Sequence, residues 1–162
     1  MPQPHISNLH EPRIIIRKKA RVLELFDGEK LVNKYKMVLG FTPSGNKSVD
    51  GDGRTPEGDF YVFTKNDQSS YYLSIGLSYP NVQDAKRGLA EKLITREEYD
   101  QIISAIANKK MPPPHTRLGG EIYIHGGGTE EDWTDGCVAV KNEDIKEIFD
   151  AAIVGMRVTI LR

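Results

Sequence analysis

Hydrophobic and polar positions alternate along the first part of the chain in a way typical of β-strands. A β-branched run, Ile14-Ile15-Ile16, follows Arg13, and a second apolar segment covers residues 20–26. Asp27-Gly28 comes next, a dipeptide suited to the positive φ angles of a type I′ turn. Residues 29–39 then alternate, which predicts a return strand and so a hairpin. Its buried face would hold Leu31, Tyr35, Met37 and Leu39, and its solvated face Lys34 and Lys36.

The middle of the chain predicts a loop, two strands and a helical insertion. Glycines and prolines interrupt residues 40–58, whereas residues 59–63 and 71–75 have the composition of strands. After Pro80 the pattern changes to a helical period. Thr95 to Glu98 has the form of a capping box, and the apolar side chains after it share one helix face: Tyr99, Ile102, Ile103 and Ile106.

The last third of the chain predicts two short strands, a helix and a closing strand. Residues 121–125 and 137–140 are the short strands, and a glycine-rich acidic loop separates them. Asn142 is placed to cap the helix, and residues 156–161 form the closing strand. With about eight strands and two or three helices, the chain is expected to be mainly β with edge helices, in the α+β class.

Length and composition indicate one domain. The 162 residues carry 22 Lys and Arg against 23 Asp and Glu, a net charge of −1, which argues against nucleic-acid binding. No apolar run approaches the roughly 20 residues that a membrane helix needs. Residues 1–12 show no apolar period and are expected to be a flexible N-terminal tail on a folded domain of residues 13–162. They also lack the pattern of a secretory signal.

A histidine and a cysteine carry the candidate chemistry. His125 ends a predicted strand before three glycines, and Cys137 follows Gly136 at the start of another strand. A free thiol has a pKa of about 8.5, so a neighbouring imidazole is needed to raise the thiolate fraction at neutral pH. The N–H groups of Gly136 and Cys137 could stabilise a developing oxyanion. A lone cysteine is most often a small buried hydrophobe, but its pairing with a strand-end histidine and glycines favours a nucleophile.

Other motifs do not hold. The glycines after His125 would need a G-x-S-x-G elbow to indicate a lipase-type site, and the chain has none. The segment 50–53 resembles the start of a calcium loop, yet Arg54 and Tyr61 occupy ligand positions. The histidines are dispersed and the cysteine is single, which excludes a zinc site by spacing. No metal and no cofactor is therefore predicted.

Two motifs together resemble a known family. His125-Gly126 followed by Thr134-Asp135-Gly136-Cys137-Val138 resembles the His-Gly and [Ser/Thr]-x-Gly-Cys-[Ile/Val] signature of the L,D-transpeptidase catalytic domain, the YkuD family. Upstream, residues 53–60 are similar to the Thr-Pro-x-Gly-x-[Phe/Tyr] turn of that family, and residues 73–81 resemble a segment of one bacterial subgroup. The resemblance extends over about residues 13–162, with the motifs in the family's order.

The resemblance implies a fold and a set of roles. The fold would be two sheets packed as a flattened sandwich or barrel with helices at its edges. Cys137 would be the nucleophile and His125 the base and later the acid, oriented by the backbone carbonyl of Gly126. The backbone N–H of Gly136, with that of Cys137, would bind the oxyanion, and the Thr134 hydroxyl would hold the loop.

One position departs from the family pattern. Many members have Arg two residues after the cysteine, and this chain has Ala139. Arg117, in the loop before the histidine strand, is a candidate to supply the missing charge, although a solvated loop arginine is the commoner role. Trp133 would wall the acyl pocket or anchor its loop. Tyr123 shares the face of His125 and would reach the site or pack beside it.

The resemblance implies acyl transfer on peptidoglycan. Cys137 would attack the amide after the L-centre of diaminopimelate in a stem-peptide donor, and an amine acceptor, including one on an envelope lipoprotein, would resolve the thioester. The acidic loop residues Glu130, Glu131, Asp132 and Asp135 would attract that amine. The alternatives are an L,D-carboxypeptidase or amide hydrolase using the same thioester, and a non-catalytic cell-wall-binding module. We expect a monomer in the periplasm or cell envelope, with the cytoplasm left open because no signal segment is recognised.

Overall fold

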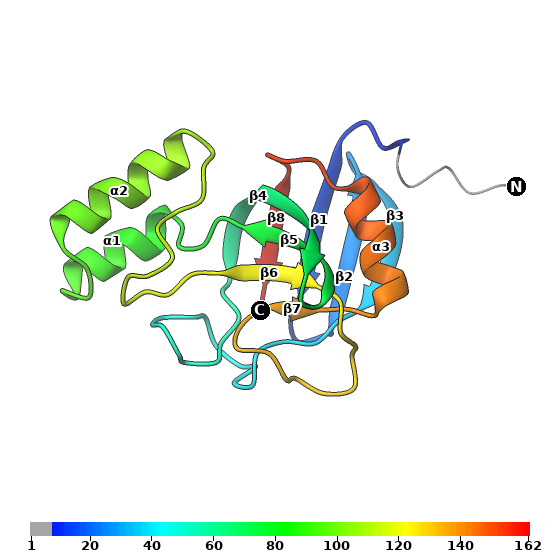
Figure 1. Ribbon diagram of the computed structural model, residues 1–162, viewed down its shortest axis with the longest axis horizontal. Coiled ribbons are helices and arrows are strands. Elements are labelled where there is room, and N and C mark those ends of the chain that lie inside the picture. The colour runs from blue at the N-terminus through cyan, green and yellow to red at the C-terminus, as the bar shows by residue number, and fades with distance from the viewer. Residues whose placement is uncertain (1–7) are drawn as a thin grey trace, which may run out of the picture.

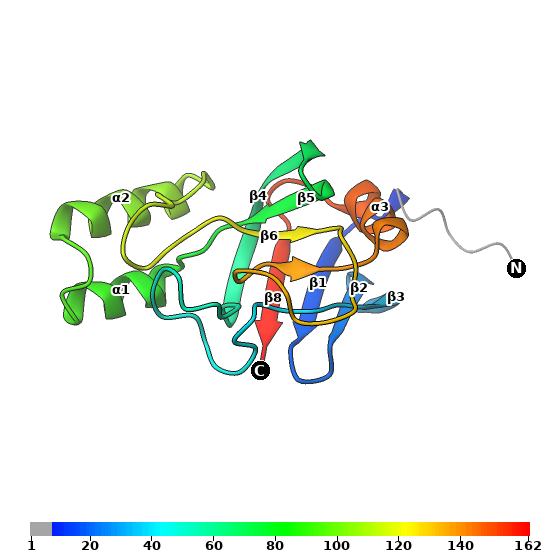
Figure 2. The same ribbon diagram turned by 60° about the horizontal axis from the view of Figure 1, so that its bottom comes forward.

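The computed structural model describes residues 8–162 (Figures 1 and 2). The strands are β1 (Pro12–Arg17), β2 (Val22–Asp27), β3 (Lys30–Lys36), β4 (Gly58–Ser69), β5 (Tyr72–Leu77), β6 (Ile122–His125), β7 (Val138–Ala139) and β8 (Arg157–Leu161). The helices are α1 (Val82–Ala90), α2 (Arg96–Ala107) and α3 (Asn142–Ala151). The strands form one sheet in the order β3-β2-β1-β8-β4-β5-β6-β7.

The long strand β4 turns this sheet back on itself. Its first residues, 58–61, pair with β8, and the residues after them, 62–69, pair with β5. The register with β5 shifts after Val62, as expected where a bulge bends a strand. As a result β5 and β6 cross over β1, β2 and β8 (Figures 1 and 2). The mainly β fold with edge helices is thus confirmed. Its eight strands form one sheet that bends into a half-barrel, where the family resemblance implied two packed sheets.

The main core fills the space between the two halves of the sheet. Alternate side chains of β1 and β2 face those of β5 and β6, and α3 closes one side. The buried residues include Ile14, Ile16, Leu23, Leu25, Ile75, Ile124, Ile145 and Ile148. This layer fixes β6, the strand that ends in the candidate histidine.

The helical insertion has a small core of its own beside the sheet. The capping box predicted at Thr95 and Glu98 is present, and Ile102 is the buried residue of the predicted apolar face. A second capping box, between Asn81 and Asp84, begins α1. The two helices pack together through Ala85, Ile94, Ile102 and Leu118 and project to one side (Figure 1).

Three local expectations were wrong. The β2–β3 loop consists of Gly28 and Glu29, and Gly28 alone has a positive φ (59°), whereas a type I′ turn needs two. Leu31 is 40% exposed because β3 is an edge strand and its register shifts near the turn. Asn142 does not cap α3; Lys141 is the N-cap residue, and the Asn142 Oδ1 accepts a hydrogen bond from the Gly127 N–H instead (3.0 Å).

The start of the chain is partly tied to the sheet. Residues 1–7 of the predicted tail lie outside the described residues. The N–H groups of His10 and Glu11 donate to the Asp27 carboxylate, and Pro12 already belongs to β1.

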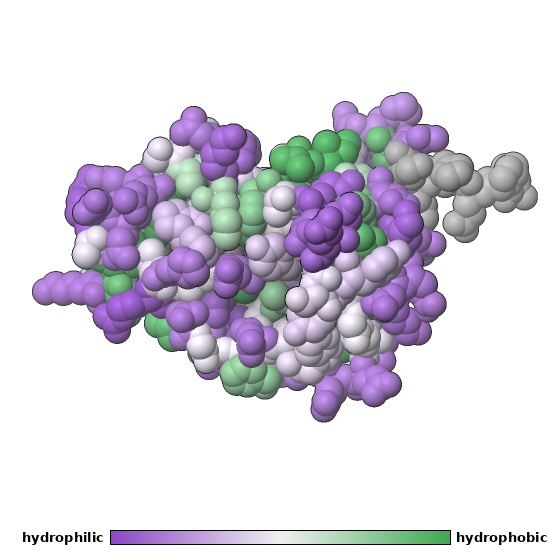
Figure 3. Space-filling view, viewed as in Figure 1, coloured by the Kyte–Doolittle hydropathy of each residue, from purple (hydrophilic) through white to green (hydrophobic). Residues whose placement is uncertain are grey.

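Hydrophilic side chains cover much of the face seen in Figure 3, with apolar areas between them. No helix in the part of the chain from residue 8 onward is long and apolar enough to cross a membrane.

Candidate active site

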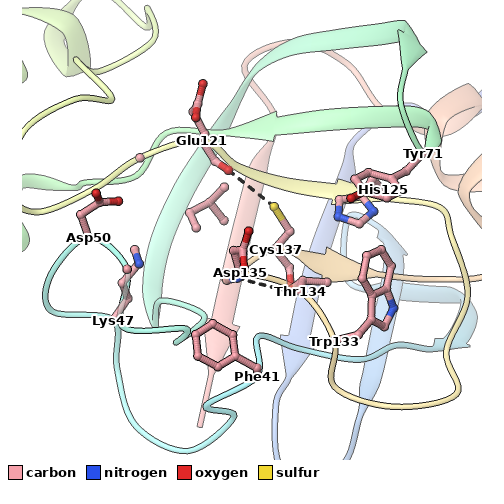
Figure 4. A pocket seen from close by; sticks show the side chains of 14 residues that line it. Phe41, Lys47, Asp50, Tyr71, Glu121, His125, Trp133, Thr134, Asp135 and Cys137 are labelled. Atoms are coloured by element: carbon pink, nitrogen blue, oxygen red, sulfur yellow. Dashed lines mark hydrogen bonds between the residues drawn. The ribbon is translucent and has the colours of Figure 1, made fainter.

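Strands β6 and β7 bring the candidate histidine and cysteine into one pocket. The two strands are parallel, with His125 opposite Ala139, and Cys137 directly precedes β7. Because side chains alternate along a strand, Cys137 lies on the same face as His125. Both line a cavity of about 450 Å³ (Figure 4). The glycine before the cysteine is required, since Gly136 has φ of 145° and a Cβ there would lie 2.9 Å from the Arg54 carbonyl oxygen.

The imidazole of His125 is held in its neutral form. Its side chain is 4% exposed, and its Nδ1 lies 2.6 Å from the carbonyl oxygen of Gly126, the contact that the family resemblance implied. A carbonyl oxygen only accepts, so Nδ1 carries the proton and Nε2 keeps a lone pair. Burial lowers the pKa of His125, and the hydrogen bond to Gly126 offsets only part of that effect. The imidazole is therefore uncharged at neutral pH.

Two aromatic side chains pack against this imidazole. The Tyr71 ring stacks on it, with centroids 4.5 Å apart and planes 20° apart, and the Trp133 ring meets it edge-on at 5.5 Å. Tyr71 and Trp133 also contact each other, at 5.2 Å. The Trp133 Nε1 donates to the carbonyl of Gly128 (3.1 Å). Trp133 thus both walls the pocket and anchors its loop, the two roles that the sequence left open.

The thiol of Cys137 is protonated and turned away from the imidazole. Its Sγ donates to the Glu121 carbonyl (3.5 Å) and accepts from the Tyr123 N–H (3.4 Å), as Figure 4 shows for the first contact. Burial raises the pKa of the Cys137 thiol to about 11, against the smaller opposing effect of the Tyr123 N–H. No hydrogen bond joins Cys137 and His125 in the described structure. Catalytic hydrogen bonds often form only with substrate bound, and a proton transfer from Cys137 to His125 would need the thiol to rotate toward Nε2.

The backbone N–H groups of Gly136 and Cys137 differ in their hydrogen bonds. The Gly136 N–H donates to the Thr134 Oγ1 (3.1 Å), and the same hydroxyl donates to the Cys137 carbonyl (2.7 Å). Thr134 therefore holds the loop in shape, as expected. The Cys137 N–H has no hydrogen-bond acceptor among the described residues, whereas that of Gly136 is already engaged. Of the two predicted oxyanion donors, Cys137 is the one available in this state.

Two predicted residues lie away from the pocket. The Tyr123 ring packs against Phe63 (6.2 Å between centroids), and only its backbone touches the thiol. Arg117 is exposed and lines a different cavity with His115. Its carbonyl accepts from the Asp50 N–H (2.8 Å), which is a structural contact. Arg117 thus supplies no positive charge to the site.

Lys47 supplies the pocket with a basic side chain that the sequence did not predict. Lys47 comes from the loop between β3 and β4, lines the pocket and is 3% exposed. Its Nζ donates to the Asp52 Oδ1 (2.9 Å) and the Val49 carbonyl (3.2 Å). Tyr71, which also lines the pocket, was not among the residues predicted from the sequence. The local sequence gives neither residue a catalytic signature, because their position depends on how the sheet curls.

The acidic loop is split between two tasks. Asp132 pairs with Arg21 (2.8 Å) and accepts from the Leu39 N–H (3.0 Å), so it fastens the loop to the first hairpin. Burial acts to raise the pKa of Asp132, but these donors hold it below the usual value. Glu130 and Glu131 instead border a second cavity of about 350 Å³, which shares its Tyr71 and Trp133 wall with the pocket. No group of three or more acidic, His or Cys side chains in residues 8–162 is arranged to hold a metal ion.

A family model matches almost the whole chain. The model of the L,D-transpeptidase catalytic domain, the YkuD family, matches residues 11–160. The chain therefore belongs to this family of enzymes. No curated protein sequence matches it significantly.

Solved structures share the fold at low identity. The helical cell shape determining protein Pgp2 from Campylobacter jejuni is 20% identical, with a TM-score of 0.66, over 98% of this chain and 51% of Pgp2. Bd1075 from Bdellovibrio bacteriovorus is 22% identical, with a TM-score of 0.61, over 94% of this chain and 48% of its own. An L,D-transpeptidase from Xylanimonas cellulosilytica is 15% identical, with a TM-score of 0.54, over 99% of this chain and 64% of its own. The chain thus spans about half the length of the first two proteins.

Proposed function

We propose that this chain acts on peptidoglycan stem peptides in the cell envelope as an L,D-transpeptidase, through a thioester on Cys137. One observation carries the proposal. Within a domain of this family, Cys137 and His125 line the same pocket, and the Gly126 carbonyl leaves the His125 Nε2 free to accept a proton. The other residues of the pocket fit the two steps of acyl transfer, first acylation of Cys137 and then transfer to an amine.

Acylation begins when the thiol leaves the Glu121 carbonyl and turns toward the imidazole. The His125 Nε2 takes the proton, and Sγ attacks the carbonyl carbon after the L-centre of diaminopimelate. The Cys137 N–H stabilises the oxyanion, and the Gly136 N–H joins it if it exchanges its bond to Thr134. The C–N bond then breaks, the imidazolium returns its proton to the leaving amine, and a thioester and a free terminal D-residue result.

An amine completes the transfer. Attack on the thioester by an acceptor amine, with His125 as base, releases Sγ and forms a new amide, either a 3→3 cross-link or an attached envelope lipoprotein. The cavity bordered by Glu130 and Glu131 adjoins the pocket, because Tyr71 and Trp133 line both. Its carboxylates attract an amine that is cationic until it loses a proton.

A second candidate uses water in place of the amine, which makes the chain an L,D-carboxypeptidase or an amide hydrolase. Ala139 favours it. That side chain is fully buried and stands where many family members have an arginine near the donor. The cysteine, the histidine and the thioester are the same in both candidates, so only the products separate them.

The test combines a covalent probe with product analysis. Intact mass after exposure to a carbapenem should show one adduct on the wild-type chain, none on Cys137→Ala and slow formation on His125→Ala. Purified stem tetrapeptide is then incubated with and without an added amine. A new amide product supports transfer, and free tripeptide alone supports hydrolysis. A chain that forms no adduct and no product, and whose Cys137→Ala variant still binds cell wall, would be a binding module instead.

A further inference from the structure

The buried cation Lys47 is used only in part by the protein. Its ammonium has three N–H donors, and two of them go to the Asp52 carboxylate and the Val49 carbonyl. Burial would raise the pKa of Asp52, but donors from Ser48, Lys47 and Arg54 hold it at about 2. Asp52 is therefore ionised at any working pH and keeps Lys47 in place. One donor of a fixed ammonium remains for a ligand.

Lys47 lies on the side of the nucleophile opposite the base. Figure 4 shows it reaching into the space between Asp50 and Asp135, with Cys137 between this group and His125. Among the described residues that line the pocket, Lys47 alone carries a permanent positive charge. Its stem passes close to Gly119, where an added Cβ would lie 3.1 Å from the Lys47 Cε. The backbone thus leaves room for this side chain.

The position of Lys47 decides which part of the donor it meets. His125 has to protonate the leaving amine, so the leaving residue lies on the His125 side of Cys137. The side that holds Lys47 then receives the acyl part, beginning with the residue whose carbonyl is attacked. This step rests on the proposed function.

The charges on that side fit a zwitterionic group. The carboxylates of Asp50 and Asp135 line the pocket near Lys47 and form no ion pair or hydrogen bond with another described side chain. A simple anion would be repelled by them, and a simple cation by Lys47. An ammonium and a carboxylate on one carbon satisfy both, and the side chain of diaminopimelate ends in such a group.

We propose that Lys47 binds the carboxylate at the end of the diaminopimelate side chain and so selects diaminopimelate donors over lysine donors. Lysine ends in an ammonium alone and leaves the third donor of Lys47 unpaired. The discrimination is therefore set by a charge-assisted hydrogen bond, with Asp50 and Asp135 receiving the ammonium that both side chains share.

The test uses tetrapeptides that differ only in the attacked residue: diaminopimelate, diaminopimelate amidated on its side-chain carboxylate, and lysine. Release of the terminal residue gives kcat/KM for each. The wild-type chain should prefer the first by about 10-fold or more over the other two. Lys47→Met should reduce that preference to about twofold by slowing the diaminopimelate peptide only, and Lys47→Arg should keep most of it. Lys36→Met, an exposed lysine on β3, is the matched control and should change nothing.

The outcomes separate this proposal from the proposed function. Equal rates on all peptides by the wild-type chain overturn the role of Lys47 and leave the proposed function standing. An equal loss of kcat/KM on all peptides in Lys47→Met also overturns the role of Lys47 and leaves the proposed function standing. Such a loss means that Lys47 acts structurally through Asp52, and the melting temperature of the variant should then fall as well. A wild-type chain that cleaves none of the peptides and forms no carbapenem adduct overturns both proposals.

Discussion

The two walls of the pocket differ in chemistry and in origin. The aromatic wall, Tyr71 and Trp133 around His125, consists of rings that exclude water from the imidazole. The charged wall, Lys47 with Asp50 and Asp135, brings one basic and two acidic side chains to the other side of Cys137. A base must stay uncharged until it receives its proton, whereas recognition of a charged substrate needs fixed charges. In the proposed mechanism the pocket meets both needs, because Cys137 lies between the two walls.

The largest expected effect on the acylation rate comes from His125, which the aromatic wall surrounds. Replacing His125 with Ala removes the base and the acid, so the rate of acylation by a carbapenem should fall by about 1,000-fold. Time-resolved intact mass measures it. Alkylation of Cys137 by iodoacetamide should change far less, because the resting thiol does not contact the imidazole. An equal loss in both reactions would mean that His125 supports the fold of the site only.

The next largest effect is the pH dependence of the alkylation of the Cys137 thiol in the free chain. Cys137 has a pKa of about 11, so its thiolate fraction rises tenfold with each unit of increasing pH as long as the pH is below that value. Alkylation should therefore accelerate by about 100-fold between about pH 7 and about pH 9 in the free chain. Stopped-time alkylation followed by mass measures this. A plateau below about pH 8 would show that the thiol is already ionised, as in a preformed thiolate–imidazolium pair.

Tyr71 tests how far stacking positions the base. An aromatic contact of this kind is worth about 0.5–1.5 kcal/mol, so Tyr71→Ala should slow acylation by about 2- to 12-fold. The pKa of His125 should move up toward its ordinary value as the ring becomes wetter, which shifts the acidic limb of the pH–rate profile upward. Tyr72→Ala is the matched control, since Tyr72 is exposed beside Tyr71 and does not line the pocket. An unchanged pH profile with a lower melting temperature would assign Tyr71 to stability alone.

The smallest effect concerns the acceptor. The double variant Glu130→Gln with Glu131→Gln should lower the ratio of amine transfer to hydrolysis by about two- to threefold at low salt, and less at high salt. Asp132 is left intact because it pairs with Arg21. Product ratios by chromatography measure the change, with Glu97→Gln on α2 as control. A ratio that stays constant at every salt concentration would remove the electrostatic role of this cavity.

The sequence predicted the aromatic wall better than the charged one. His125, Trp133 and Cys137 lie within a short stretch whose motif resembles the family, and that resemblance implied a mainly β fold with helices at its edges. Lys47 and Tyr71 come from a long loop and from a hairpin turn. Their place beside the nucleophile depends on the bend in β4, and no local pattern encodes it. For the same reason Arg117 was named as a candidate cation and Lys47 was not, because only Arg117 lies close to His125 along the chain.

The clamp between Arg21 and Asp132 has a consequence for shortened forms of the enzyme. Arg21 and Asp132 are 111 positions apart, and the contact between Asp132 and Leu39 spans 93 positions. The loop that carries the cysteine is thus fastened by residues from the distant N-terminal part of the chain. A truncated chain that lacks the first hairpin loses Arg21, and its cysteine loop then lacks this ion pair.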